Sequence, residues 1–96
     1  MLTYFEAPWP GTPVPEGEPV RFFYEVDEAA DNVLRSVELY ADGSLQRNSL
    51  QLEARDGWPC VSLWHGSFAE LSVGIPLEPL LSSAFEEHWQ RAVDTL

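Results

Sequence analysis

Three side chains offer the nucleophile, base and metal-ligand chemistry of an active site: Cys60, His65 and His88. A thiol beside an imidazole is a nucleophile–base pair, and both residue types bind zinc. The Cys-x4-His spacing of Cys60 and His65 is not a zinc pattern, because zinc sites need three or four well-placed ligands. Cys60 is the chain's one cysteine, so it forms no internal disulfide, and we interpret it as a small buried hydrophobic residue.

Carboxylates offer a second kind of chemistry. Glu25 and Asp27 share one side of a predicted strand at roughly 6.5–7 Å, a spacing that suits an acid–base pair. Raising the pKa of either needs an apolar pocket, which nothing in the sequence indicates, so we favour a solvated acidic face. Glu86-Glu87-His88 places metal-ligand types on consecutive helix positions that point in different directions. The sequence has no HExxH, glycine-rich phosphate loop or GxSxG motif, and we expect no enzyme, no cofactor and no metal.

The charge of the chain is strongly unbalanced. Sixteen Asp and Glu face five Arg with no Lys, which gives a formal net charge of -11 in 96 residues. Self-repulsion at this level opposes compaction, so we expect an acidic surface that serves to attract a basic protein partner. The same charge disfavours direct binding to nucleic acid and to anionic membranes. Four Trp and 45% hydrophobic residues exclude a disordered acidic tail.

The N-terminal part of the chain is rich in proline. Its first residues lack the basic start and apolar stretch of a signal peptide, and no apolar run approaches the ~18 residues of a membrane span. We therefore expect a soluble cytoplasmic protein, either monomer or homodimer, with one domain over residues 1–96. Residues 1–19 form a proline-rich segment with a possible strand over 2–6. Pro10 and Pro13 have the PxxP spacing of a peptide ligand, but without a basic flank a structural loop is favoured.

Antiparallel strands are predicted between residues 20 and 64. Apolar residues alternate from Val20, and Asp42-Gly43 between two alternating segments indicates a tight hairpin. The following segment changes phase, which predicts either a bulge near Asn48-Ser49 or two shorter strands. Asp56-Gly57 indicates another turn. The predicted strands cover residues 20–27, 33–41, 45–54 and 60–64.

A helix is predicted at the end of the chain. After a loop over 65–81, apolar residues recur at helical spacing from Phe85 to Leu96, which predicts an amphipathic helix over 83–95. Ser83 and Glu86 have the spacing of a capping box, so the helix should begin near Ala84. The expected fold class is α+β: an antiparallel meander sheet of three to five strands packed against one C-terminal helix.

One helix covers one face of a sheet, so the other face is a candidate docking surface. We expect one side of the first strand, Val20, Phe22, Tyr24 and Val26, to face the helix. The residues between them along the strand would then point outward and form a surface that mixes aromatic side chains with carboxylates. The alternative is that the proline-rich segment and Trp9 cover that face. Residues 53–58 form a second acidic and aromatic locus, or a loop whose Trp58 folds inward. The predicted partner-binding residues are Phe23, Glu25, Asp27, Glu28, Asp31, Glu38 and Tyr40.

The motifs together resemble a family of small acidic bacterial domains of unassigned activity. The similarity covers residues 9–54 and 82–93. It comprises the Trp9–Pro19 entry, the strands Val20–Asp27 and Val33–Tyr40, the Asp42-Gly43 turn and the Phe85-x3-Trp89-x2-Ala92 helix. Members of that family have the character of immunity proteins encoded near polymorphic toxins. The resemblance implies a protein that docks on a bacterial toxin and neutralises it.

Two other functions fit the same residues. A phage-encoded inhibitor or nucleic-acid mimic has the same electrostatics with a different target. A small-ligand binding domain or an enzyme would instead use a cavity between sheet and helix, lined by His65 or His88. A pocket that contains a histidine favours this second function, whereas a filled core favours the inhibitor.

Overall fold

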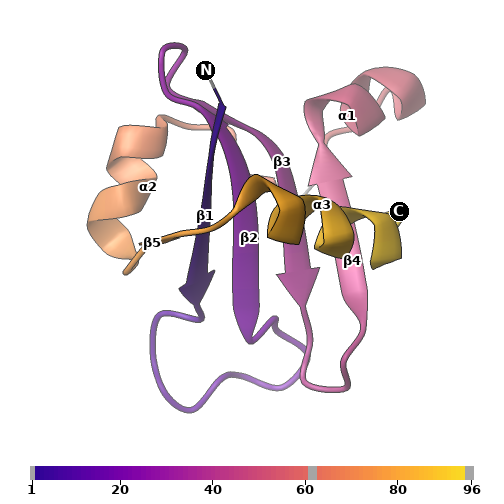
Figure 1. Cartoon of the computed structure of the whole chain (residues 1–96). Coiled ribbons are helices and arrows are strands. Elements are labelled where there is room, and N and C mark those ends of the chain that lie inside the picture. Colours follow the sequence, from indigo (N-terminus) through magenta and orange to yellow (C-terminus); the bar gives the residue numbers. More distant parts are fainter. Residues whose placement is uncertain (1, 61–62, 95–96) are drawn as a thin grey trace.

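The computed structural model describes residues 2–60 and 63–94, in which three helices accompany a six-stranded sheet (Figure 1). The expected α+β class is confirmed. The strands are β1 (Leu2–Pro8), β2 (Arg21–Asp27), β3 (Asn32–Leu39), β4 (Leu45–Ser49), β5 (Glu78–Pro79) and β6 (Val93–Asp94). The helices are α1 (Leu50–Asp56), α2 (Phe68–Gly74) and α3 (Ser82–Arg91). No helix in the described ranges is long and apolar enough to cross a membrane.

The centre of the sheet is the predicted antiparallel meander. Strands β1 to β4 pair in sequence order, and the predicted hairpin joins β3 to β4. Its turn is closed by the Tyr40 N–H, which donates to the Ser44 carbonyl at 2.9 Å. Gly43 has a φ of 88°, in the left-handed region that glycine adopts without steric cost, so the hairpin prediction is confirmed.

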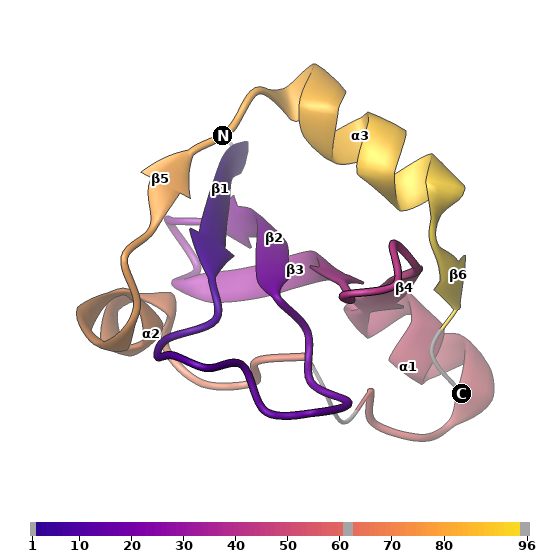
Figure 2. The same cartoon turned by 90° about the horizontal axis from the view of Figure 1, so that it is seen from below.

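The edges of the sheet differ from the prediction. Strand β5 pairs with β1, and β6 lies parallel to β4, so the sheet is mixed and has the order β5-β1-β2-β3-β4-β6. Helix α3 connects these two edges by crossing one face of the sheet (Figure 2). Both edge strands have two residues, which is too short for an alternating pattern to predict them.

Helix α1 occupies part of the segment predicted as a third strand. Ser49 ends β4, and its hydroxyl accepts a hydrogen bond from the Leu52 N–H at 2.9 Å, which caps the helix. Gly57, with a φ of 73°, ends α1. The bulge predicted at Asn48-Ser49 and its alternative, two shorter strands, are therefore both wrong, because a helix follows β4. The sheet's bulge lies in β3, where Leu34 is the extra residue between the partners of Glu25 and Val26.

Both faces of the sheet are covered, contrary to the prediction of one open face. Tyr24 and Val26 pack against residues from α1, α2 and the segment between them, whereas Phe23 and Val37 pack against Phe85 of α3 (Figure 2). The expectation that the C-terminal helix covers the Phe22, Tyr24 and Val26 side is wrong. Because Phe22, Phe23 and Tyr24 are consecutive aromatics, alternation does not indicate which side of β2 is the more apolar.

The C-terminal third differs from the predicted loop and helix. Residues 65–81, predicted as a loop, contain α2 and β5. Helix α3 begins at Ser82, and its N-cap, Leu81, makes no side-chain hydrogen bond, so the predicted capping box is wrong. The helix ends at Arg91, and residues 95–96 of the prediction lie outside the described residues. Cys60, Leu63 and Trp64 lie outside any strand, so the predicted fourth strand is wrong where it is described.

Candidate functional site

The predicted docking residues at the centre of the sheet are internal. Phe23, Glu25 and Glu38 are each 5% exposed or less, because α3 and the α1–α2 layer cover the two faces. Phe23 stacks on the His88 ring with centroids 4.1 Å apart. Glu38 accepts a hydrogen bond from Asn48 Nδ2 at 3.1 Å. The prediction that these three residues point outward is wrong, and their side chains contact other parts of the chain.

Glu25 belongs to an ion-pair network beneath α3. Its carboxylate accepts from Arg35 Nε at 2.8 Å and from the Tyr4 hydroxyl at 3.0 Å, and Arg35 also pairs with Glu86 of the helix. Burial acts to raise the pKa of Glu25, but the hydrogen bonds from Arg35 and Tyr4 outweigh it and lower that pKa. Glu25 is therefore a buried anion that holds Arg35 under α3. The prediction that Glu25 lies on a solvated acidic face is therefore wrong.

The turn after β2 contains the second group of predicted docking residues. Asp31, with a φ of 56°, accepts hydrogen bonds from the Ser67 hydroxyl and from the Ala69 N–H, the latter at 2.9 Å. These two donors, the hydroxyl first, lower the pKa of Asp31. Asp31 thus anchors the start of α2. Asp27 is half-buried and accepts from the Ala30 N–H at 3.2 Å, whereas Glu28 is exposed.

Arginine side chains are all neutralised within the described residues. Each of the five lies within ion-pair distance of at least one carboxylate. The pairs are Arg21 with Glu6, Arg35 with Glu25 and Glu86, Arg47 with Asp94, Arg55 with Asp56 and Asp94, and Arg91 with Glu87. Several exposed carboxylates have no arginine partner in the described ranges: Glu16, Glu18, Glu28, Asp42, Glu70 and Glu78. The exposed charge that remains unneutralised is therefore negative.

Three of these carboxylates gather at one end of the sheet. The β1–β2 connection, which carries Glu16 and Glu18, lies beside the β3–β4 hairpin, which carries Asp42 (Figure 1). Between them is a groove of about 570 Å³ that Tyr40 also lines. We call Glu16, Glu18, Tyr40 and Asp42 the Tyr40 groove.

Electrostatics in the Tyr40 groove favour a cation. Burial, and then the charges of Glu38 and Glu18, raise the pKa of Tyr40, so its hydroxyl stays protonated. The Ser44 hydroxyl and N–H lower the pKa of Asp42, which keeps that carboxylate ionised. A neutral phenol among carboxylates suits a lysine or arginine side chain of a partner. The sequence predicted Tyr40 but missed the three acids, which lie in loops without a periodic signal.

The cysteine and histidines do not form a nucleophile–base pair. The Cys60 thiol donates to the Ser49 carbonyl at 3.8 Å, and the Cys60 N–H donates to Glu53 at 2.7 Å. The same Glu53 carboxylate pairs with His65. Glu53 thus links α1 to the following segment. The Cys60 thiol bonds the Ser49 carbonyl, whereas the His65 ring pairs with Glu53. Across the described positions, no three His, Cys, Asp or Glu side chains gather in a way that could hold a metal ion.

Comparison of the chain with protein-family models, with curated proteins and with solved structures finds no match.

Proposed function

We propose that this protein is a non-enzymatic binding protein that docks on a partner with a basic surface. The observation that carries the proposal is the Tyr40 groove, where three carboxylates line a groove with a phenol and no arginine lines the groove among the described residues. Complementary charge steers such a partner into contact and raises the association rate. A lysine or arginine of the partner would enter the groove, while the wider acidic surface provides long-range attraction.

The partner that fits best is a bacterial toxin, and the protein would then act as its immunity protein or inhibitor. Two things support this choice: the sequence motifs that resemble immunity proteins, and the charge, because toxins that cleave nucleic acid present basic clefts. An acidic protein that covers such a cleft blocks it stoichiometrically. A phage-encoded inhibitor or nucleic-acid mimic has the same electrostatics, and the identity of the captured partner distinguishes these functions.

Capture from lysate with matched variants tests the groove. The tagged full chain is incubated with lysate at ~50 and ~300 mM salt, beside a groove variant, Glu16→Gln/Glu18→Gln/Asp42→Asn. A control variant, Glu28→Gln/Glu70→Gln/Glu78→Gln, loses the same formal charge elsewhere. We expect one basic partner that the unmodified chain and the control retain and that the groove variant loses. Equal retention by the two variants would overturn the groove as the docking site.

Co-expression then tests the toxin assignment. The captured partner is expressed alone, and with the unmodified chain or the groove variant. Growth arrest that the unmodified chain relieves and the groove variant does not relieve supports the immunity function. A partner that is harmless when expressed alone contradicts it and leaves a binding protein of another kind.

A further inference from the structure

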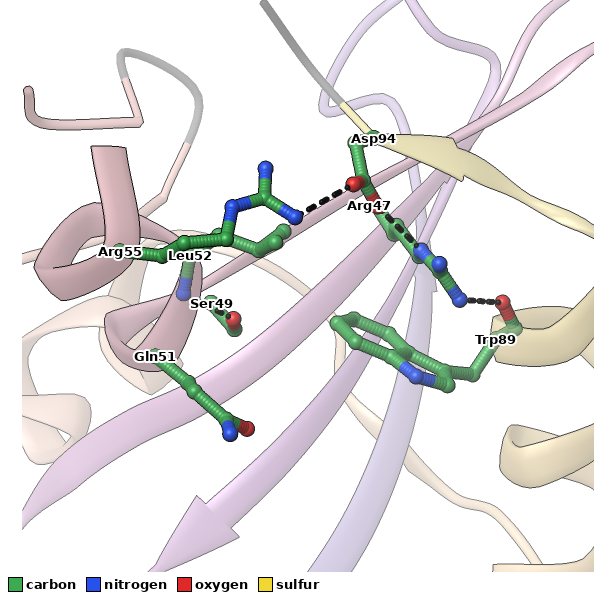
Figure 3. Close-up of a pocket in the computed structure, with 7 residues that line it drawn as sticks. All are labelled: Arg47, Ser49, Gln51, Leu52, Arg55, Trp89 and Asp94. Carbon is green, nitrogen blue, oxygen red and sulfur yellow. Dashed lines mark hydrogen bonds and ion pairs between the residues drawn. The ribbon is translucent and has the colours of Figure 1, made fainter.

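A second pocket contains arginine side chains, which the Tyr40 groove lacks. The two pockets share no lining residue. Its volume is about 320 Å³, and it lies between the start of α1 and the end of α3. Figure 3 shows Gln51, Leu52 and Arg55 on one side of the pocket and Arg47, Trp89 and Asp94 on the other. Two of the chain's five arginines therefore face each other across one small cavity.

The two arginines converge on a single carboxylate. Asp94 Oδ1 accepts from Arg47 Nε at 2.7 Å, and Asp94 Oδ2 accepts from Arg55 Nη1 at 3.1 Å (Figure 3). One carboxylate oxygen for each guanidinium is a strong and directional arrangement. The geometry shows that β4 and α1 place the two guanidinium groups at the right separation for one carboxylate.

Each guanidinium has a second anchor that does not depend on Asp94. Arg47 Nη1 donates to the Trp89 carbonyl at 3.0 Å, and its guanidinium lies 4.9 Å from the Trp89 ring centroid. Arg55 donates to both carboxylate oxygens of Asp56, from Nε at 2.7 Å and from Nη2 at 2.9 Å. Arg47 would therefore keep its position if Asp94 left, which reduces the entropic cost of binding a replacement, while Arg55 would keep its surface pair with Asp56.

Asp94 is held in the pocket chiefly by the two guanidinium groups. It lies on β6, where Val93 pairs with Gln46 of β4 and Asp94 pairs with Arg47. Val93 is 64% exposed, so little apolar burial holds this strand in place. The carboxylate in the pocket is thus held by hydrogen bonds that the carboxylate of a ligand could replace one for one.

We propose that this pocket binds a small organic carboxylate, whose carboxylate group takes the place of Asp94 between Arg47 and Arg55. The amide of Gln51 is available to bond a polar group on the rest of the ligand, and Leu52 and Trp89 provide apolar walls. The volume is at the lower end of the range for ligand sites, which selects a small molecule. Asp94 acts as an internal competitor for the site.

Titration of the full chain tests the proposal directly. The ¹⁵N-labelled protein is titrated at constant ionic strength with succinate, and in parallel with its neutral diamide, succinamide, and with sulfate. We expect succinate alone to cause saturable shifts of the Gln51 side-chain amide, the Trp89 indole N–H and the Arg47 and Arg55 Nε–H signals. No saturable shift overturns the proposal. Equal shifts with sulfate or succinamide overturn the carboxylate assignment.

Matched variants locate the site. Arg55→Gln should abolish the succinate shifts, whereas Arg91→Gln, which removes an arginine outside the pocket, should preserve them. Asp94→Asn removes the competing charge and should tighten succinate binding about tenfold, since a neutral amide competes less well than a carboxylate for the two guanidinium groups. Binding by Asp94→Asn without any binding by the unmodified chain overturns the proposal, because the substitution would then have created the site.

Discussion

Arg35 is the side chain on which the packing of α3 most depends. It donates to buried Glu25 and to Glu86, and its guanidinium lies 5.0 Å from the Phe85 ring centroid and 4.7 Å from that of Trp89. One cation thus joins two strands of the sheet to two aromatic residues of the helix. Removing it leaves the Glu25 carboxylate buried without its main counter-charge.

Replacing Arg35 should therefore destabilise the fold strongly. We expect Arg35→Met to lower the free energy of unfolding by about 3 kcal/mol, because an uncompensated carboxylate remains inside the protein. The double variant Glu25→Gln/Arg35→Met should recover part of this loss, since the buried charge is gone. Urea unfolding of the three proteins measures both effects. A double variant less stable than Arg35→Met would contradict the assignment of the cost to the Glu25 charge.

The same pair predicts a pH dependence. The pKa of Glu25 lies below its ordinary value of 4.5 in the folded protein, so its folded state favours the carboxylate. The stability that this pair contributes is present above pH 4.5 and is lost as the pH falls through the lower folded-state pKa. The difference in unfolding free energy between the unmodified chain and Arg35→Met should narrow as the pH falls, first as Glu25 of the variant protonates and then through the lower pKa of Glu25 in the unmodified chain. A constant difference from pH ~7 to ~3 would contradict it.

At the residue scale, the sequence indicates which side chains carry unusual chemistry, but it is a poor guide to where those side chains lie. The outward orientation predicted for Phe23, Glu25 and Glu38 rests on their alternation with apolar residues. Alternation separates the two faces of a strand, but it does not state which layer covers each face. The ion pair with Arg35 depends on the register of β2 with β3, which the bulge at Leu34 sets. No local signal in the sequence places that bulge.

Among the elements, α2 depends on a residue distant in sequence. Asp31 receives the Ala69 N–H and the Ser67 hydroxyl, so the β2–β3 turn caps a helix that begins at Phe68. Asp31 also has a left-handed backbone, which Asn and Asp tolerate better than other non-glycine residues. The contact between Asp31 and α2 is non-local, so the sequence does not indicate it. For this reason the sequence predicts Asp31 as a docking residue.

Loss of the Asp31 cap should loosen α2 locally. Asp31→Ala removes the acceptor and strains the left-handed backbone, so amide exchange in Phe68–Gly74 should speed up about tenfold. Asp31→Asn retains an acceptor and tolerates the backbone, and should change exchange much less. Hydrogen exchange followed by NMR measures both variants. Unchanged exchange in Asp31→Ala would show that α2 is held by its apolar contacts alone.

Elements with a period or a strong turn signal were predictable. The central strands, the Asp42-Gly43 hairpin and a C-terminal helix followed from the sequence, because each has either an alternating pattern or a specific turn residue. Helices α1 and α2 have seven residues each, so they span too few turns for a helical repeat to stand out. Strands β5 and β6 form only because α3 carries the chain across the sheet, which is a property of the topology.

At the scale of the whole molecule, the negative charge that the proposed docking needs also lowers the stability of the unbound protein. Each arginine is engaged in an internal ion pair, so little positive charge remains to offset the repulsion among the exposed carboxylates. A surface kept for a basic partner carries this cost in the unbound protein. Part of this negative charge is gathered in one place, because Glu16, Glu18 and Asp42 line the Tyr40 groove.

Removing the groove acids should therefore stabilise the unbound protein. At ~10 mM salt, Glu16→Gln/Glu18→Gln/Asp42→Asn should melt about 3–5 °C above the unmodified chain, and at ~200 mM the gap should shrink because salt screens the repulsion. The control variant Glu28→Gln/Glu70→Gln/Glu78→Gln removes the same charge from scattered positions and should gain less. Thermal melts of the three proteins at both salt concentrations measure the effect. A groove variant that melts below the unmodified chain at low salt would show that these carboxylates support the fold, and the case for keeping them as a docking surface would then fail.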